Sequence, residues 1–318
     1  MIARVAMITD TGRKRRRNED AYVCEPPLFA IADGMGGAQA GEVASRLAAA
    51  ALKERGPEAL AGEQRIVELI QAANRRVYDR SSTDPNTSGM GTTMTVALVE
   101  DGRVAFGHVG DSRAYLIREG RMEQLTEDHS LVNELMKSGK LSREEAETHP
   151  QRSVITRALG TDPDVDVDTF SVSAQTGDLF LLCSDGLTDM VSEDAILGVV
   201  EHHRDDIDGA LRALVKEAYR GGGEDNITVV AFEIADVAVH DGQTQEQALP
   251  PELARKLEEE ETLDEADEVP LVQVAEPEEE PERDATKRRH RRRRALAWLA
   301  LLLFLAAVAA LVVWRLLS

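Results

Sequence analysis

Two short apolar segments each lead into an aspartate and a glycine, and this repeated pattern constrains the fold most strongly. Residues 28–32 precede Asp33-Gly34, and residues 179–183 precede Ser184-Asp185-Gly186. Each segment has the length of a buried strand, and the glycines allow the main chain to approach a ligand closely. One such Asp-Gly pair is usually only a turn. Two of them would bring carboxylates to one edge of a fold, as hard divalent cations require.

The chain has 318 residues, a length that predicts one large domain or two small ones with appendages. Its formal net charge of -21 argues against a nucleic-acid partner. The two cysteines, Cys24 and Cys183, lie in apolar strand-like segments. Buried reduced thiols are therefore expected, rather than a disulfide or a metal site, and they suit a reducing compartment. The first residues lack the pattern of a secretory signal.

The composition of the last quarter of the chain changes in three steps. Residues 236–286 are rich in Glu and Asp with scattered Pro, which predicts a disordered acidic linker. Residues 287–294 form a basic collar, and residues 295–314 carry no charge. The last segment would span roughly 30 Å as a helix, enough to cross a bilayer. Its basic flank predicts a single-pass cell-membrane protein with everything before the collar in the cytoplasm. A buried core helix is the alternative.

Strand-like and helical patterns alternate over residues 1–235, which predicts an α+β domain. A β-meander is expected over 92–125, with its first hairpin turn at Asp101-Gly102. Ser142 and Glu145 have the spacing of a capping box. The other expected strands are 2–8 and 227–234, and the expected helices are 40–54, 64–80, one from about 192, and 208–219.

Acidic residues recur at predicted strand ends and loop tips. They are Glu19, Asp20, Asp33, Asp111, Asp185 and Asp225. Each alone is typical of a turn or a cap, but together they indicate a two-metal centre that activates water. The basic loop Arg13–Arg17 is either a solvated loop or a phosphate-binding one. A phosphocysteine route is excluded because no Cys-x5-Arg motif is present.

Ordered motifs over residues 2–235 resemble the PPM family of metal-dependent protein serine/threonine phosphatases (type 2C), especially its bacterial branch. The matching stretches are Asp10-x-Gly12-x-x-Arg15-x-x-Asn18-Glu19-Asp20, Ala32-Asp33-Gly34-Met35-Gly36-Gly37, Gly89-Met90-Gly91-Thr92-Thr93, Val109-Gly110-Asp111-Ser112-Arg113, Leu125-Thr126-x-Asp128-His129-Ser130, Thr156-Arg157-Ala158-Leu159-Gly160, Ser184-Asp185-Gly186-Leu187 and Asp225-Asn226-Ile227-Thr228.

This resemblance implies an αββα four-layer sandwich of two antiparallel sheets flanked by helices. It also implies two Mn²⁺ or Mg²⁺ ions, with a third in bacterial members. Asp33 would bridge two metals, and the Gly34 carbonyl would complete the shell of one of them. Asp185 and Asp225 would bind the first metal, and Glu19 would act on the second, directly or through water. Asp111 would hold the third ion with Asp185. Arg15 would bind the substrate phosphate, and residues 133–152 would form a mobile flap.

The resemblance departs from the animal members at Met35, where they carry a histidine proposed as the general acid. Methionine cannot transfer a proton, so water or another group must protonate the leaving alkoxide. His129 is a candidate acid, but a packing role fits its neighbours Asp128 and Ser130 better.

The expected function is hydrolysis of phosphoserine and phosphothreonine in proteins, opposing a membrane serine/threonine kinase and acting on its substrates. A non-catalytic membrane adaptor for phosphoproteins is the alternative from another class. A phosphatase dedicated to one regulatory phosphoprotein is a second alternative. The acidic linker is either a spacer or an internal mimic of a phosphorylated substrate.

Overall fold

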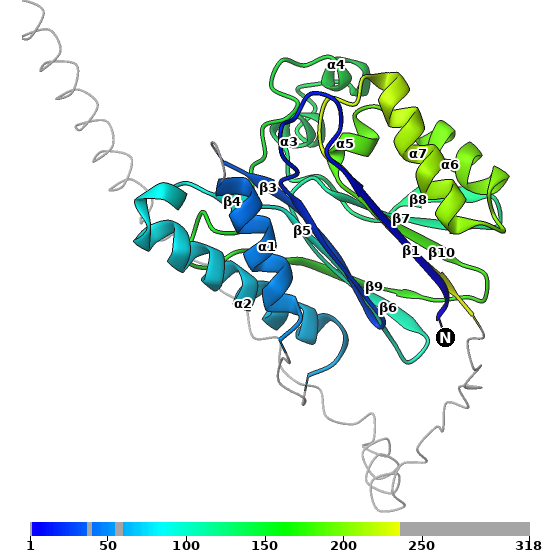
Figure 1. The fold of residues 1–318 in the computed structure, drawn as a ribbon, viewed down its shortest axis with the longest axis horizontal. Helices are drawn as coiled ribbons and strands as arrows, with labels where there is room; N and C mark the ends of the chain where they lie inside the picture. Colours follow the sequence, from blue (N-terminus) through cyan, green and yellow to red (C-terminus); the bar gives the residue numbers. More distant parts are fainter. Residues whose placement is uncertain (1, 37–39, 55–59, 236–318) are drawn as a thin grey trace, which may run out of the picture. The chain divides into compact units, whose positions relative to one another are not determined.

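The structure, a computed structural model, describes residues 2–36, 40–54 and 60–235 (Figure 1). The chain divides into a unit of residues 1–243 and a second unit of residues 244–318, and all described residues lie in the first. The predicted linker 236–286, collar 287–294 and membrane span 295–314 lie outside the described residues. Among the residues that are described, no helix is long and apolar enough to span a membrane.

Two antiparallel sheets form the centre of the described unit. The first contains, in spatial order, β1 (Ile2–Asp10), β11 (Ile227–Ile234), β10 (Leu179–Cys183), β7 (Arg113–Arg118) and β8 (Arg121–Gln124). The second contains β2 (Asp20–Glu25), β3 (Leu28–Met35), β5 (Met94–Glu100), β6 (Arg103–Val109) and β9 (Asp168–Ser173), with β4 (Gly91–Thr92) paired to β3.

Of the described helices, four cover the outer faces of the two sheets: α1 (Ala40–Leu52), α2 (Gly62–Thr83), α6 (Glu193–His202) and α7 (Ile207–Gly221). The other described helices are α3 (Leu131–Lys137), α4 (Arg143–Glu147) and α5 (Asp185–Thr188), with a 3-10 turn, η1 (Pro85–Thr87). Figure 1 shows α1 and α2 on the side of the second sheet and α6 and α7 on the side of the first. The predicted order of layers, helix, sheet, sheet and helix, is confirmed in this part of the chain.

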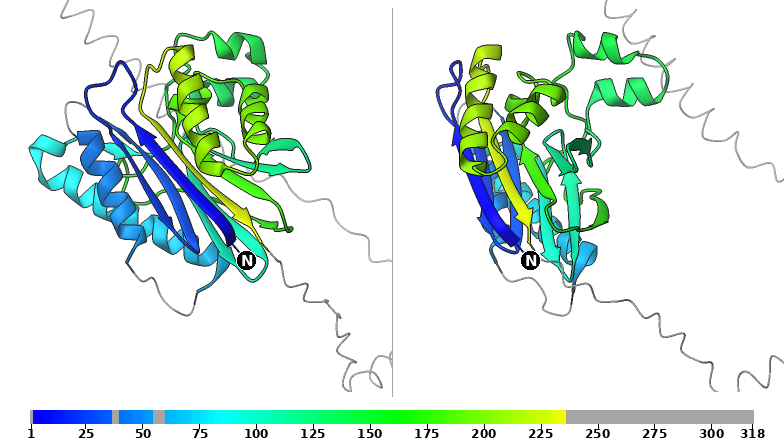
Figure 2. Two further views of the ribbon diagram at one scale, coloured as in Figure 1. Left: turned by 45° about the vertical axis from the view of Figure 1, so that its right-hand side comes forward. Right: turned by 90° about the vertical axis from the view of Figure 1, so that its right-hand side faces the viewer.

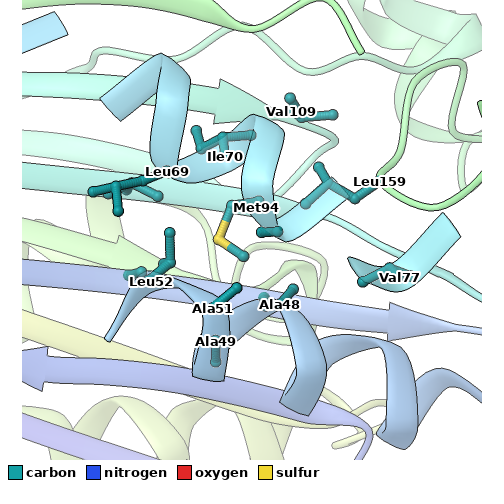
Figure 3. Packing of buried hydrophobic residues seen from close by; sticks show 14 of the residues in the cluster. Ala48, Ala49, Ala51, Leu52, Leu69, Ile70, Val77, Met94, Val109 and Leu159 are labelled. Atoms are coloured by element: carbon teal, nitrogen blue, oxygen red, sulfur yellow. The ribbon is translucent and has the colours of Figure 1, made fainter. Parts of the chain in front are cut away.

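The apolar periodicity of α2 explains why this helix forms and how it packs. Its predicted stripe is buried against the second sheet, as Figure 3 shows for Leu69, Ile70 and Val77 beside Met94. The helix approaches β6 so closely that a Cβ at Gly107 would lie 2.1 Å from Cγ2 of Ile66. Fully burying an aliphatic side chain contributes about 1.5–3 kcal/mol, which makes this stripe a major source of stability.

Aromatic rings from both sheets pack together in the layer between them. Phe29 of β3 stacks on Phe232 of β11 with ring centroids 4.1 Å apart. Phe180 of β10 stacks on Phe232 at 5.2 Å and contacts Phe106 of β6 at 5.8 Å. These ring contacts join the two sheets across the layer between them.

The predicted β-meander over 92–125 is only partly correct. The β5–β6 hairpin forms with Asp101 and Gly102 at positive φ, as expected for its turn. The other neighbour of β6, however, is β9, and β7 pairs with β10 and β8 in the first sheet. The chain therefore crosses between sheets after β6, at Gly110, whose φ is 115°. This crossing places Asp111 between the two sheets.

Candidate metal centre

The strand ends of both sheets bring the predicted acids to one edge of the sandwich. Asp33 lies in β3 directly opposite Asp20, the first residue of β2. The sequence placed Asp33 at the end of its strand, but β3 continues to Met35. Asp185 begins α5 after β10, and Asp225 precedes β11, which pairs with β10. Carboxylates from distant parts of the chain thus converge through strand pairing.

Asp20 connects the two sheets through its side chain. Its Oδ2 accepts hydrogen bonds from the hydroxyls of Ser184, at 2.9 Å, and Thr228, at 2.6 Å. Both partners belong to the segments that carry Asp185 and Asp225. Asp20 was among the acids that the sequence singled out, but no role was predicted for it. Its position next to Glu19 in the Asn18-Glu19-Asp20 motif indicated that it lies near the site.

The buried acids repel one another. Burial, followed by the charges of Asp20 and Asp185, raises the pKa of Asp33 well above its usual range. Burial and then the charge of Asp111 likewise raise the pKa of Asp185. The pKa of Asp111 rises to about 7, chiefly through burial. Such concentrated negative charge in a low-dielectric site is favourable only beside a compensating cation.

Three buried carboxylate oxygens have no hydrogen-bond partner in the described part of the chain: Oδ1 of Asp20, Asp111 and Asp185. Buried polar atoms are normally satisfied, so unpartnered oxygens from three segments fit a hard divalent cation. Within the described ranges, no group of three or more acid, His or Cys side chains is placed so that it could hold a metal ion as it stands. Oδ2 of Asp225, a predicted ligand, lies 2.5 Å from the Arg15 guanidinium.

The glycine after Asp33 is required by close packing. A Cβ at Gly34 would lie 2.2 Å from the carbonyl oxygen of Gly41 and 2.6 Å from that of Glu19. A Cβ at Gly41 would in turn lie 2.7 Å from the Gly34 carbonyl oxygen and 2.8 Å from Oε2 of Glu19. The Gly34 carbonyl and the Glu19 carboxylate, both predicted ligands, therefore lie together at the start of α1.

The basic loop of residues 13–17 lies beside Asp225. Nη2 of Arg15 lies 2.5 Å from Oδ2 of Asp225. The next residue, Asn226, donates from Nδ2 to the carbonyls of Thr11 and Arg17, each at 2.9 Å. Its Oδ1 accepts from the Glu19 amide at 2.7 Å. One side chain thus holds the basic loop, Glu19 and Asp225 together.

Comparison with known proteins identifies the family of this chain. A family model described as protein phosphatase 2C matches residues 13–219. The chain belongs to the protein phosphatase 2C family. It is 41% identical over 248 residues to the serine/threonine protein phosphatase PstP of Mycobacterium tuberculosis, with 77% of this chain and 47% of that protein covered. It therefore spans about half the length of that relative.

Two further comparisons extend over nearly whole relatives of this family. The serine/threonine phosphatase stp of Listeria monocytogenes is 42% identical over 236 residues, which cover 71% of this chain and 93% of the relative. A crystal structure of the PstP catalytic domain with two manganese ions is 37% identical, with a TM-score of 0.67, covering 73% of this chain and 98% of that one. The phosphatase 2C fold of the described unit is thereby established.

The remaining predicted features of this phosphatase 2C domain are structural. His129 is buried; its Nδ1 accepts from the Gly110 amide at 3.0 Å, and its Nε2 donates to Asp168 at 3.1 Å. Because both ring nitrogens are engaged, His129 has the packing role that its neighbours suggested. Both cysteines are free, and burial raises the pKa of Cys183 to about 12. That thiol is therefore inert.

The segment predicted as a flap contains α3 and α4, which project from the end of the sheets in Figure 2. The capping box at α4 is confirmed: the Ser142 amide donates to Glu145, and the Glu145 amide donates to Ser142. Arg152, after α4, lies 3.4 Å from Asp189 at the end of α5. This ion pair links the segment to the helix that carries Asp185.

Proposed function

We propose that this chain is a metal-dependent phosphatase that hydrolyses phosphoserine and phosphothreonine in proteins. The observation that carries the proposal is the group of unpartnered, buried carboxylate oxygens contributed by both sheets beside Arg15. Burying unpaired carboxylates costs free energy, so a core that served stability alone would not contain them. The names of the relatives in the phosphatase 2C family support the same activity.

The proposed ligands are those that the resemblance to the family implies. Asp33 would hold two cations and the Gly34 carbonyl one of them; Asp185 and Asp225 would bind the first cation, and Glu19 would act on the second directly or through water. Asp111 and Asp185 would hold a third. Mn²⁺ is the favoured ion because the related PstP catalytic domain was crystallised with two manganese ions; Mg²⁺ has the same preference for oxygen ligands.

The bound cations would activate water and neutralise charge on the phosphoryl group. The chain's own contribution is orientation. Arg15 has a half-exposed side chain at the edge of the site, so its guanidinium is placed to bind phosphate oxygens as a fork. Met35 pairs through its backbone with Gly91 and offers no transferable proton. The proton for the leaving alkoxide would therefore come from water or from another group.

Phosphate release from a phosphothreonine peptide by the full-length chain tests this proposal. We expect release with Mn²⁺, none with a chelator, and loss of release in Asp33→Asn. Asp79→Asn is the matched control, because Asp79 is exposed on α2. A folded protein that releases no phosphate with any divalent metal would instead support a non-catalytic phosphoprotein adaptor.

We further propose that the catalytic domain faces the cytoplasm from a single C-terminal span and opposes a membrane serine/threonine kinase. The uncharged residues 295–314 and the basic collar before them support this location. Membrane fractionation with protease digestion of sealed vesicles from either side tests it. Depletion of the protein should raise phosphorylation of the kinase; an unchanged level would contradict the kinase partner.

A further inference from the structure

The loop after β1 carries five consecutive basic residues, Arg13–Arg17, and all five are exposed. The chain as a whole has a net charge of -21, so this segment is an exception to its charge balance. In Figures 1 and 2 the loop, in dark blue, extends past the strand ends near α7. The Arg13 amide donates to the Gly223 carbonyl at 2.8 Å, and Asn226 holds both ends of the loop.

Two of these cations are committed to the domain itself. The guanidinium of Arg13 lies over the ring of Tyr219, 4.8 Å from its centroid. Arg15 pairs with Asp225 at the candidate metal centre. These contacts hold the backbone of the loop in place, so the other three basic side chains extend from fixed positions.

The other three cations are available to a ligand. Lys14 lies 3.3 Å from Glu224, and both side chains are more than half exposed, at 64% and 56%. Arg17 lies 3.5 Å from Glu42. Arg16 has no hydrogen-bond or ion-pair partner within the described residues. Exposed ion pairs contribute little to stability, so an incoming carboxylate can replace the present partners.

We propose that Lys14, Arg16 and Arg17 of this basic segment bind acidic residues that flank the phosphorylated side chain of a substrate protein. This inference rests on the proposed function, because a phosphorylated residue at the metal centre places its neighbours along the edge where the segment lies. Arginine binds carboxylates as a fork, and the fixed backbone reduces the entropic cost of binding. The contact of Arg15 with the metal centre favours a peptide over a lipid surface.

Two phosphothreonine peptides test the proposal on the full-length chain. One has glutamates on both sides of the phosphothreonine, and the other has alanines and serines. We expect kcat/KM at low salt to be higher for the acidic peptide, although the net charge of the chain alone would repel it. The ratio of the two values should fall with added salt. It should also fall about two- to five-fold per cation removed in a Lys14→Ala/Arg16→Ala variant.

Arg212→Ala is the matched control, because Arg212 is 64% exposed on α7 and forms an ion pair with Asp206 at 3.7 Å; its ratio should equal that of the wild type. A wild-type ratio at or below one would overturn the inference, as would an unchanged ratio in the double variant. Weaker binding of the double variant to anionic vesicles, with an unchanged peptide ratio, would assign the segment to a lipid surface. Failure to hydrolyse either peptide with Mn²⁺ would instead reject the proposed function.

Discussion

Asp20 lies directly opposite Asp33 in the antiparallel pair of β2 and β3. Like charges at such positions destabilise a sheet, and burial raises the pKa of Asp20 to about 6. The fold nevertheless holds Asp20 in place through Ser184 and Thr228 of the other sheet. The repulsion between these two acids lowers the stability of the metal-free fold, and a divalent cation nearby would relieve it.

Asp33→Asn should abolish activity and stabilise the metal-free fold. The pKa of Asp33 is raised in the folded state, so the stability that its protonated form contributes is lost as pH rises through that pKa. Asparagine does not ionise, so the variant does not lose this stability as pH rises. We expect phosphate release to fall more than about 100-fold, since changes around metal ligands alone cost 10–100-fold. Urea unfolding with chelator at pH 8 should show a higher free energy of unfolding than the wild type; a lower one would indicate a structural role.

Divalent metal should stabilise the wild type by mass action. A free Mn²⁺ concentration of about 100 times Kd adds about 2.7 kcal/mol for one site. Thermal unfolding at increasing Mn²⁺ measures this effect as a rise in Tm. Asp79→Asn should retain the rise and Asp185→Asn should lose most of it. Equal shifts in both variants would place the bound metal elsewhere.

Gly12→Ala should damage the site more than Gly89→Ala. The two glycines have φ values of 73° and 75°, so alanine carries a similar backbone cost at each, about 1–2 kcal/mol. A Cβ at Gly12 would also lie 2.1 Å from the carbonyl oxygen of Asp225, whereas nothing lies within 4 Å at Gly89. Calorimetry should find weaker Mn²⁺ binding only in Gly12→Ala. Similar metal affinity in the two variants would contradict the close packing.

Arg15→Ala should weaken phosphate binding. A charge-assisted hydrogen bond contributes enough that its loss should raise the inhibition constant of inorganic phosphate roughly tenfold or more. Arg15→Lys should give an intermediate value, because it keeps the charge without the planar fork. Steady-state inhibition measures both. An inhibition constant equal to that of the wild type in Arg15→Ala would remove Arg15 from the phosphate site.

His108 should make folding pH-dependent on the acid side. Burial, and then the charge of His129, lower its pKa to about 4. Its Nε2 lies 3.1 Å from the Glu127 carbonyl oxygen, so the neutral ring carries its proton there. An unfolded histidine titrates near 6.5, so stability from neutral His108 is complete above that pH and is lost as pH falls towards 4.

His108→Gln isolates this contribution. From pH 7 to pH 5, the stability of the wild type relative to this variant should decrease by about 2 kcal/mol. Urea unfolding of both proteins at the two pH values gives the difference, in which shared carboxylate titrations cancel. A difference that does not change with pH would contradict the neutral state of His108.

Local patterns predicted local structure well. The 3.6-residue periodicity of α2, the Ser142–Glu145 capping box and the Asp101-Gly102 turn each depend on residues close in sequence, and all were confirmed. Strand β9, Asp168–Ser173, was missed although its apolar Phe170 and Val172 alternate with polar neighbours, because the segment is short and has only these two large apolar side chains. It becomes a strand by pairing with β6, a contact that no local pattern encodes.

The kinds and positions of the acids were determined by the sequence alone, as was their order along the chain. The tertiary structure decided which of them meet. The crossing after β6 places Asp111 between the sheets, and pairing of β2 with β3 sets Asp20 against Asp33. Asn226 then joins the basic loop to Asp225 and Glu19. Such convergence depends on strand pairing and on packing between residues far apart in the sequence, of which the aromatic contacts between the sheets are one example, because local patterns do not select which strands become neighbours.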